Sequence, residues 1–463
     1  MVSVTVIGGS LAGLAFALQA ARRGHQVTVL EHDHGPPPGP LDAVSPLWPR
    51  PGVPHFRQPH HYLARAVRVM QEEMPDVLTA VLGHGAQQDP VDGGGDAADR
   101  HLWVRRLVLE AELWRAAERA PGLTVRCGVL ARGFMTGPDC HGVPRVAGVL
   151  TSEGERIGAD LVVDASGRRS RTPRWLARLP TRPVAEQADS CRFWYLTRDY
   201  RLRPGAAFPT LQVPIATVLD YLTAIAFPAD GGLFSLAFAL SADDPYRQRL
   251  RVPEVFDRVQ RQIPMMAPWL DCADPLDVPR PVGGIENRWR RLVDDRGPVV
   301  AGLVLLGDAA MHTNPTWGRG ISLAFWHGQH LADRLDGAVG DGCRFVADAD
   351  SWAAAQLGDL YTSQVTADEA RRRQIAAALR GDRLPPPTDL VNRVVAAIAA
   401  MRDDDPLVRR ASDRVYNLLA TPRELMSDRQ VAGRILTFLK AHPVLEQAAS
   451  HPDRATFERL VSG

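Results

Sequence analysis

Several features that mark common protein classes are scarce in this chain of 463 residues. It has five cysteines without a Cys-x-x-Cys spacing, which fits reduced thiols better than a disulfide framework or a zinc site. Lys and Arg number 54 against 53 Asp and Glu, and no block of one sign predicts a nucleic-acid or membrane surface. No apolar run approaches the length of a membrane span, and Met1 leads into a strand without a secretory signal. We therefore expect a cytoplasmic protein whose partner is a small molecule.

The N-terminal residues carry the pattern of a dinucleotide-binding βαβ unit. Strands are expected at residues 2–7 and 26–30, with a helix at 14–23 between them. The turn before the helix reads Gly8-Gly9-Ser10-Leu11-Ala12-Gly13, and such turns let a phosphate approach the helix N-terminus. Ser10 stands where a middle glycine is usual, and it is small enough to keep the site. Glu31 follows the second strand, where an acid binds a ribose hydroxyl in a dinucleotide fold.

A second informative stretch covers residues 303–323. An apolar run at 304–306 is typical of a covered parallel strand, and Asp308 comes just past it, where open α/β sheets bind their ligands. Gly318 and Gly320 then allow close approach of the backbone before a helix begins. The free N–H groups and the dipole of that helix favour an electron-rich or anionic group.

The remaining segments alternate between loops, strands and helices. A Pro- and Gly-rich loop is expected at residues 34–54, and Gly93-Gly94-Gly95 predict a surface insertion at 91–99. A third glycine turn, at 164–170, follows a buried strand. Alternating strands rich in Phe, Tyr and Val at 191–240, with a helix at 253–263, predict an inserted antiparallel sheet. Nearly all of the chain after residue 323 is expected to be helical.

Together these motifs resemble the FAD-dependent monooxygenases of the para-hydroxybenzoate hydroxylase type. The resemblance covers about residues 1–335. It rests on the Gly8–Gly13 turn with Glu31, the turn at 164–170, and Gly307-Asp308 followed by Pro315 and Gly318-Arg319-Gly320. Within that group the chain looks closest to an actinobacterial branch that includes polyether epoxidases, through Gly52-Val53-Pro54-His55 with His60.

The resemblance implies a set of residues that bind FAD. Arg106, three residues before the Leu109-Glu110 pair, is implied to contact the cofactor, Arg50 to lie near its pyrophosphate, and Asp308 to bond its ribityl or ribose hydroxyls. The expected cofactor-binding residues are Gly8, Ser10, Ala12, Gly13, Glu31, Arg50, Arg106, Val129, Asp164, Gly307, Asp308, Gly318 and Gly320.

The expected chemistry is centred on the flavin, so no protein residue is assigned as certainly catalytic. The candidate pocket residues are His60, Asn314, Pro315 and Trp317. No metal is expected, because no carboxylate or cysteine stands at ligand spacing from His55, His60 and His61. Aromatic residues of the inserted sheet are candidates for an apolar roof over the flavin, and half of them must face away if the segments are strands: Phe193, Trp194, Tyr195, Phe227, Phe234 and Phe238.

The predicted fold class is α/β, with an FAD-binding Rossmann-like (doubly wound) domain, an inserted antiparallel β-sheet substrate domain and a C-terminal helical region. Residues 1–180 are expected to form the first part of the FAD-binding domain and 181–285 the substrate domain, a sheet plus a helix. Residues 286–380 are expected to form the second part of the FAD-binding domain with long helices, and 381–463 the C-terminal helical region.

The resemblance implies an FAD-dependent monooxygenase that hydroxylates or epoxidises a lipophilic, secondary-metabolite-like substrate through a flavin hydroperoxide. The electrons are expected from NAD(P)H or from a separate flavin reductase. Typical aromatic hydroxylases carry an Asp-Gly pair, implicated in holding NAD(P)H, where this chain has Ser166-Gly167. That departure weakens the expectation of direct reduction by NAD(P)H.

Three alternatives stay open on the same fold. One is an FAD-dependent reductase or dehydrogenase. Another is a flavin halogenase, although the Trp-x-Trp-x-Ile-Pro segment of halogenases and their usual lysine are missing from this chain. The third is a non-catalytic flavin-fold binding module, because a fold does not fix a function.

Overall fold

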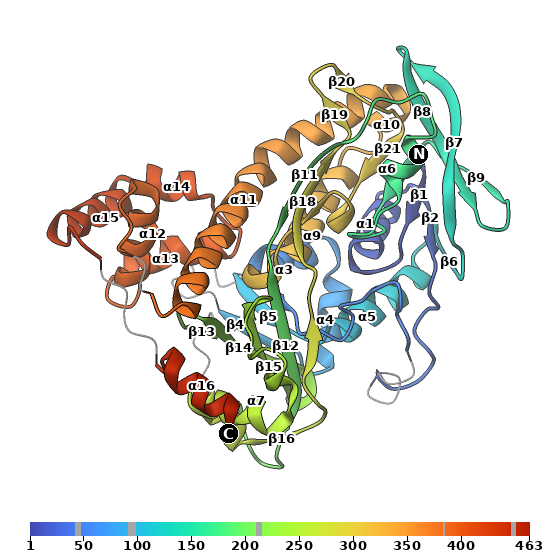
Figure 1. Ribbon diagram of the computed structural model, residues 1–463. Coiled ribbons are helices and arrows are strands. Elements are labelled where there is room, and N and C mark those ends of the chain that lie inside the picture. The colour runs from blue at the N-terminus through green and yellow to red at the C-terminus, as the bar shows by residue number, and fades with distance from the viewer. Residues whose placement is uncertain (42–47, 91–98, 210–214, 383–384, 446–450) are drawn as a thin grey trace.

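A computed structural model describes residues 1–41, 48–90, 99–209, 215–382, 385–445 and 451–463 (Figure 1). The expected insertion around Gly93-Gly94-Gly95 lies outside these ranges, as does the part of the long loop at 42–47. None of the described helices combines the length and the apolar character that a bilayer span requires.

A parallel five-stranded sheet organises the N-terminal half of the chain. Its order is β21-β10-β1-β2-β6, with bounds Leu303–Leu305, Leu161–Asp164, Ser3–Ile7, Gln26–Glu31 and Leu123–Cys127. All four pairings are parallel, so the carboxyl ends of the strands share one edge. Strands β10 and β21 are buried along their whole length, as expected for short apolar strands that are covered on both faces.

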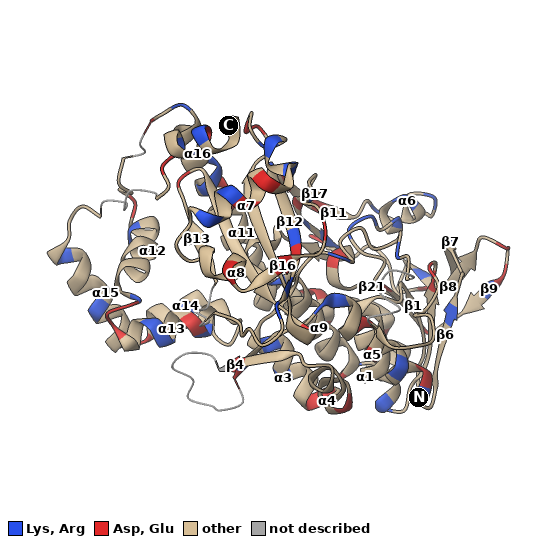
Figure 2. Cartoon of the chain, turned by 90° about the horizontal axis from the view of Figure 1, so that it is seen from below, with Lys and Arg blue, Asp and Glu red and all other residues tan. Residues whose placement is uncertain are grey.

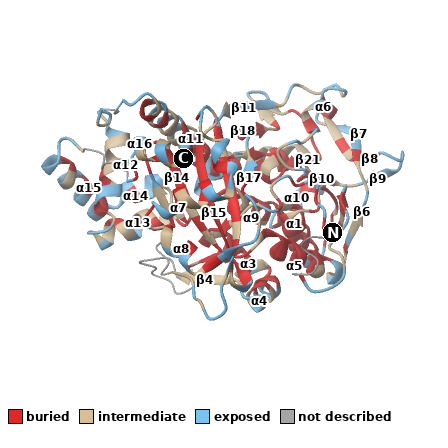
Figure 3. Ribbon diagram, turned by 60° about the horizontal axis from the view of Figure 1, so that its bottom comes forward, coloured by how far each residue is buried: buried red, intermediate tan, exposed pale blue. Residues whose placement is uncertain are grey.

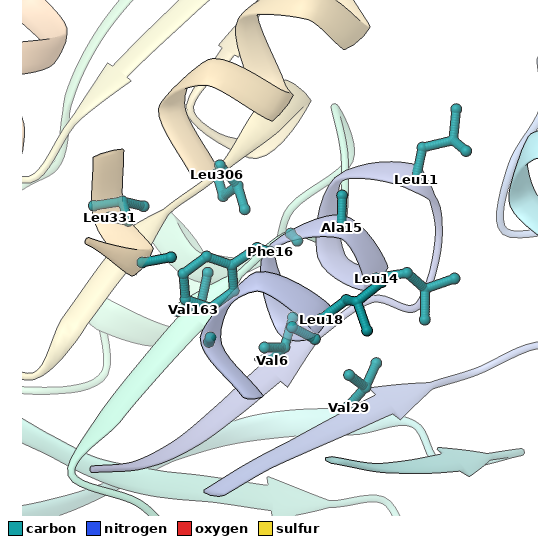
Figure 4. Packing of buried hydrophobic residues seen from close by; sticks show 14 of the residues in the cluster. Val6, Leu11, Leu14, Ala15, Phe16, Leu18, Val29, Val163, Leu306 and Leu331 are labelled. Carbon is teal, nitrogen blue, oxygen red and sulfur yellow. The ribbon is translucent and has the colours of Figure 1, made fainter. Parts of the chain in front are cut away.

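Helices cover one face of this sheet, and a hairpin sheet covers the other. The helices are α1 (Leu11–Arg22), α3 (Ala64–Glu73), α4 (Pro75–Gly83), α5 (Arg106–Arg119) and α9 (Gly320–Ala332). Ten of the twelve residues of α1 are buried, because α5 and α9 both pack against it. Phe16 of α1 packs among Val163, Leu306 and Leu331 (Figure 4). The hairpin sheet consists of β7 (Ala131–Cys140), β8 (Val143–Thr151) and β9 (Arg156–Gly158).

The inserted antiparallel sheet forms a second core. Its order is β13-β14-β15-β12-β16, with β17 also paired to β12, and the bounds are Ala216–Val218, Leu222–Pro228, Leu233–Ser241, Phe193–Leu202, Ala273–Pro275 and Arg280–Val282. Phe234 and Phe238 pack with helices α7 (Pro253–Arg261) and α8 (Ala267–Asp271). Phe193 and Tyr195 pack in a different cluster with Ile375. The expected aromatic residues are therefore divided between the two faces of the sheet.

Short strands connect the two large sheets. Strands β11 (Ala185–Ser190), β18 (Glu286–Arg291) and β22 (Met311–His312) form one small antiparallel sheet, with β11 beside β18 along the molecule (Figure 1). Strands β3 (His61–Tyr62), β5 (Arg100–Trp103) and β4 (Gln87–Pro90) form another, and β19 (Val293–Asp294) pairs with β20 (Gly297–Pro298). Helix α6 (Thr172–Leu176) follows β10, and short 3-10 turns lie at Asp230–Gly232, Arg249–Arg251, Gly307–Ala309 and Pro315–Trp317.

The C-terminal part of the chain is helical, which confirms the predicted fold class. Its helices are α10 (Gly337–Gly340), α11 (Gly342–Leu379), α12 (Leu390–Met401), α13 (Pro406–Tyr416), α14 (Pro422–Ser427), α15 (Arg429–Ala441) and α16 (Arg454–Ser462). Helices α12 to α15 share a small core of their own and expose much of their surface (Figure 3). Helix α16 returns to the antiparallel sheet, where Phe457 lies 5.0 Å from the ring of Tyr221. The domain boundaries expected from the sequence stay a prediction.

Candidate functional site

Three glycine turns meet at the carboxyl edge of the parallel sheet. Gly8 has a φ of +106°, and a Cβ there would lie 2.6 Å from the carbonyl oxygen of Ala165. A Cβ on Gly13 would lie 1.9 Å from the carbonyl oxygen of Gly8, and one on Gly307 would lie 3.0 Å from the Cβ of Ala12. The backbones after β1 and β10 are therefore in direct contact, and the backbone after β21 packs directly on the side chain of Ala12, which leaves room only for glycine at these positions.

Two helix N-termini open toward this edge. No side chain caps α1 at Ser10 or α9 at Arg319, so protein side chains leave the N–H groups of both first turns available to an electron-rich ligand. Gly320 begins α9, and a Cβ there would lie 3.9 Å from Oδ1 of Asp308. Among the described residues no hydrogen bond reaches the Asp308 carboxylate, and Nε2 of His312 lies 3.9 Å from its Oδ2. Asp308 can therefore accept a hydroxyl from a ligand.

A fully buried arginine holds the first glycine turn in place. Arg50 donates from Nε to Oε1 of Glu110 at 2.9 Å and from Nη2 to the carbonyl oxygen of Gly9 at 3.2 Å. Its Nη1 lies 3.2 Å from Glu31 Oε1 and 3.5 Å from Asp33 Oδ2. Burial opposes the charge on Arg50, but Glu110, Glu31 and Asp33 together raise its pKa above the ordinary value. The cation is thus stabilised by three carboxylates.

The same network continues through Ser10, Arg106 and His60. Arg106 donates to Ser10 Oγ at 2.8 Å, and Ser10 donates to Glu110 Oε2 at 2.7 Å. Arg106 Nη1 lies 3.3 Å from Nε2 of His60, whose Nδ1 lies 2.8 Å from the carbonyl oxygen of Gln58. Burial and the charge of Arg106 lower the pKa of His60 to about 3. His60 is therefore neutral at pH 7, with its proton on Nδ1 and Nε2 free to accept from Arg106.

The structure thus joins Ser10, Glu31, Arg50, His60 and Arg106, which the sequence analysis predicted separately. Glu31 accepts from the backbone N–H of Gly9 at 2.6 Å, and the N–H of Val129 donates to the carbonyl oxygen of Glu31 at 2.9 Å. The role of these residues toward a cofactor stays a prediction. The sequence analysis missed the role of Glu110 and Asp33, although Asp33 stands only two residues after Glu31.

In the turn after β10, the buried carboxylate of Asp164 accepts hydrogen bonds from residues of the same turn. Asp164 accepts from the N–H and Oγ of Ser166 at 2.9 and 2.6 Å, and from the hydroxyls of Ser170 and Thr172 at 2.5 and 2.6 Å. The side chain of Asp164 is therefore occupied by the turn that follows it. Ser166 is exposed at the edge of the site, in the position where the sequence analysis noted the departure from an Asp-Gly pair.

On the other side of the edge, Asn314 joins three parts of the chain. Its N–H donates to Asn287 Oδ1 at 2.7 Å, its Nδ2 donates to Asp368 Oδ1 at 2.8 Å, and its Oδ1 accepts from the hydroxyl of Tyr195. Asn314 is fully buried, so its side chain positions the turn. Tyr195, Asn287 and Asp368 were missed, since no local motif links a strand of the inserted sheet, β18 and α11.

Pro315 and Trp317, the remaining candidate pocket residues, are exposed. Trp317 lies 5.1 Å from the guanidinium of Arg319 and 6.2 Å from the ring of Tyr416. The turn from Pro315 to Trp317 is therefore open to solvent, with Tyr416 of α13 beside it, and its contact with a ligand stays a prediction.

Two buried histidines lie behind this turn. His61 stacks on Trp103 with ring centroids 3.8 Å apart, and its Nε2 lies 2.7 Å from Nδ1 of His101. Burial and the neighbouring His101 lower the pKa of His61 well below the ordinary value, and burial with Arg402 lowers the pKa of His101 to about 4. Both rings are neutral at pH 7.

Replacing Arg50 by Met is expected to destabilise the protein by about 3–5 kcal/mol, because Glu31, Asp33 and Glu110 would lose their buried counter-charge. Arg22→Met is the matched control, since its pair with Asp76 is partly exposed and is worth at most about 1 kcal/mol. Urea unfolding of both variants measures the difference. An Arg50→Met variant as stable as the control would contradict the role assigned to the network.

Acid is expected to destabilise the fold through His61 and His101. Above pH 6.5 neither the folded nor the unfolded chain protonates these rings, but at lower pH the unfolded chain takes up protons that the folded chain refuses. Stability is therefore lost between pH 6.5 and about 4. His101→Gln should flatten the slope of the unfolding free energy there by up to about 1.4 kcal/mol per pH unit. His442→Gln, on the exposed end of α15, should leave the slope unchanged.

Comparison with known proteins agrees with this architecture. A family profile described as an NAD(P)-binding Rossmann-like domain matches residues 6–40. Protein Rv3254 of Mycobacterium tuberculosis (strain ATCC 25618 / H37Rv) is 28% identical over 356 residues, covering 71% of this chain and 72% of that protein.

Solved structures of flavin-dependent enzymes share the fold. PqsL, described as a probable FAD-dependent monooxygenase from Pseudomonas aeruginosa, is 16% identical with a TM-score of 0.56, covering 81% of this chain and 98% of that one. The p-nitrophenol 4-monooxygenase PnpA from Pseudomonas putida DLL-E4 is 16% identical with a TM-score of 0.58, covering 90% and 99%. The flavin-dependent brominase Bmp2 is 14% identical with a TM-score of 0.62, covering 96% and 99%. At such identities the likeness is one of fold, and this chain has the fold of these flavin-dependent enzymes.

Proposed function

We propose that this chain is an FAD-dependent monooxygenase that inserts one oxygen atom from O2 into a lipophilic small molecule. The observation that carries the proposal is the meeting of two uncapped helix N-termini, α1 and α9, with the carboxylate of Asp308 over a floor of glycine turns. A dinucleotide needs such a surface, because its diphosphate and its electron-rich ring both favour N–H donors and positive dipoles.

The residues at this edge fit FAD. The turn from Gly8 to Gly13 would hold the diphosphate at the start of α1, Glu31 and Val129 would flank the adenosine ribose, and Asp308 would bind hydroxyls of the ribityl chain. Gly318 and Gly320 would let the backbone approach the flavin ring. Arg50, Ser10 and Arg106 would support this surface through the buried network described above.

When bound, FAD would supply electron storage and the activation of O2. The chain itself would supply positive potential beside the ring. Arg319, at the start of α9, is buried and donates to the carbonyl oxygen of Leu360 at 3.4 Å and to Ser363 Oγ at 3.3 Å. Burial lowers the pKa of Arg319 to about 10, so it remains a cation at pH 7. No described carboxylate lies within ion-pair distance of it, and its charge favours negative charge on a reduced ring.

The substrate would meet an apolar wall. Pro315 and Trp317 are exposed at the turn that precedes α9, and Tyr416 lies beside Trp317. Because these groups offer mainly apolar surface, a lipophilic substrate with an electron-rich ring or double bond is favoured over a highly charged one. Hydroxylation or epoxidation in the manner of the actinobacterial polyether epoxidases is the finer proposal.

The electron donor would be NAD(P)H or a separate flavin reductase. The turn with Ser166 leads into α6, next to a hollow of about 280 Å³ that is lined by Arg132, Arg171, Arg174, Trp175 and Arg178. None of these four arginines forms an ion pair with a described carboxylate, and basic residues lie along and beside α6 (Figure 2). An unpaired cluster of this kind favours the phosphates of NAD(P)H.

A flavin halogenase is the second candidate, favoured by the likeness to the brominase Bmp2 along almost the whole chain. The two candidates share a cofactor and differ in the product. Incubation with substrate and bromide would give a brominated product from a halogenase and an oxygenated product from a monooxygenase.

Purified protein is expected to be yellow and, once reduced, to consume O2 and yield a product one oxygen atom heavier than its substrate. Asp308→Ala should lower FAD occupancy, because the partly exposed carboxylate in the turn after β21 would no longer bind hydroxyls. Asp359→Ala, an exposed acid on α11, is the control. Absorbance at flavin wavelengths and mass spectrometry provide the measurements. A colourless protein that added FAD does not restore would refute the proposal, and reoxidation without a modified substrate would favour the binding module.

Arg174→Ala is expected to raise the KM for NADPH about tenfold or more while leaving FAD occupancy unchanged, because the hollow would lose one phosphate-binding cation. Anaerobic stopped-flow mixing with NADH and NADPH, with and without a general flavin reductase, measures the rate of flavin bleaching. Exposed Arg423→Ala on α14 is the matched control. If only the reductase bleaches the flavin, and if Arg174→Ala then changes nothing, the donor is the reductase.

A further inference from the structure

We propose that the tip of the β7–β8 hairpin and the start of α11 form a binding site for a zinc-class divalent cation. The ligands would be Cys140, His141 and Asp341, with Cys343 as the fourth. The hairpin tip and the start of α11 are 201 residues apart in the sequence, between Cys140 and Asp341, and they meet at the outer edge of the parallel-sheet domain (Figure 1). The site is independent of the proposed flavin chemistry.

The positions of three ligand atoms match a small tetrahedral site. Cys140 Sγ lies 3.7 Å from Asp341 Oδ1, and His141 Nε2 lies 3.7 Å from Asp341 Oδ2. All three ligand atoms lie within 4.8 Å of one another. Zinc bonds of about 2.0–2.3 Å place the ligands of a tetrahedron about 3.3–3.8 Å apart. The two 3.7 Å distances end on different oxygens of Asp341, so with either oxygen as the ligand one separation already fits and rotation of side chains on the surface would close the others.

The donor types also fit zinc. A thiolate, an imidazole and a carboxylate are its usual protein ligands. Cys343 lies beside this group and donates from Sγ to the carbonyl oxygen of Cys140 at 3.2 Å, so rotation of its side chain would bring a second thiol to the three converging ligand atoms. Within the described ranges, no other group of three or more His, Cys, Asp or Glu side chains brings its ligand atoms this close together.

The backbone presents these side chains from fixed positions. His141 adopts a left-handed φ of 51° at the hairpin tip and is followed by Gly142 with a φ of 78°. A residue other than glycine in this region is strained, and the strain here directs an exposed histidine toward Asp341. Asp341 caps α11, since its Oδ1 accepts from the N–H of Arg344 at 2.9 Å. The cap leaves Oδ2 facing His141.

The sequence analysis expected no metal, because no carboxylate or cysteine stands at ligand spacing from His55, His60 and His61. That test does not detect the proposed site, because its ligands come in two pairs from distant segments. Cys140 and His141 form one pair, and Asp341 and Cys343 form the other. A bound cation would join the hairpin that covers the parallel sheet to the long helix that runs to the antiparallel sheet.

The test uses the full chain, purified with a thiol-free reductant, stripped with a chelator and titrated with zinc alone by calorimetry. The wild type should bind one zinc per chain, and Cys140→Ser and His141→Ala should each weaken binding by at least about tenfold. Cys272→Ser, which changes a partly buried cysteine in the antiparallel-sheet domain, should bind like the wild type. Circular dichroism melting of each variant separates loss of a ligand from loss of the fold.

Cobalt supplies a second readout. Its difference spectrum should show thiolate charge-transfer and tetrahedral bands in the wild type and in Cys272→Ser, and these bands should be lost in the double variant Cys140→Ser/Cys343→Ser. Failure of the wild type to bind zinc stoichiometrically would overturn the proposal. Unchanged zinc affinity in folded Cys140→Ser would also overturn it. So would a thiol titration showing that a disulfide between Cys140 and Cys343 persists in the presence of the reductant.

Discussion

The backbone contact between the turns after β1 and β10 is the constraint on which the rest of the site depends. A Cβ on Gly8 would lie 2.6 Å from the carbonyl oxygen of Ala165, and a Cβ on Gly13 would lie 1.9 Å from that of Gly8. Such contacts bring α1 so close to the sheet edge that its first turn faces the start of α9. The parallel pairing fixes this distance, because the register of β1 with β10 sets where both strands end. A side chain at Gly8 would push the turn after β1 away from the turn after β10, and one at Gly13 would push α1 away from the turn at Gly8.

The charge beneath this edge follows from the same closeness. The turn at Gly9 leaves a carbonyl oxygen and an N–H in a buried space, and Arg50 and Glu31 satisfy them. A buried arginine is costly unless carboxylates surround it, and three of them do. The main role of this buried network is therefore to fix the position of the Gly9 turn at the sheet edge, and its net contribution to the free energy of folding is secondary. It also couples the long loop that carries Arg50 to α5, because Glu110 accepts from both Arg50 and Ser10.

The parallel strands and their glycine turns could be predicted because each is encoded in a short stretch, an apolar run followed directly by glycine. The fold class followed from these stretches, and the structure confirms it. Arg50 and Arg106 were predicted through resemblance alone, since no periodicity marks a buried cation. Tyr195 and Asp368 could not be predicted, because they meet Asn314 from segments that are distant in the sequence. The hydrogen bonds of Tyr195 and Asp368 with Asn314 form only when the antiparallel sheet and α11 are packed together in the folded chain.

That contact separates the buried, anchored part of the turn at Asn314 from the exposed part at Pro315 to Trp317. Asp368 is buried and accepts from Asn287, Asn314 and Gln364, so moving the turn would leave a carboxylate without donors in a low-dielectric interior. Burial raises the pKa of Asp368, and the hydrogen bonds from those three amides oppose that rise. Only Pro315 to Trp317 project beyond this anchor. Their neighbour Tyr416 lies on α13 but packs in the cluster that contains Leu323 of α9 and Leu360 of α11, not in the core that α12 to α15 share. The surroundings of the Pro315–Trp317 turn therefore depend on how α13 docks on α9 and α11, whereas the glycine edge is held by the parallel sheet.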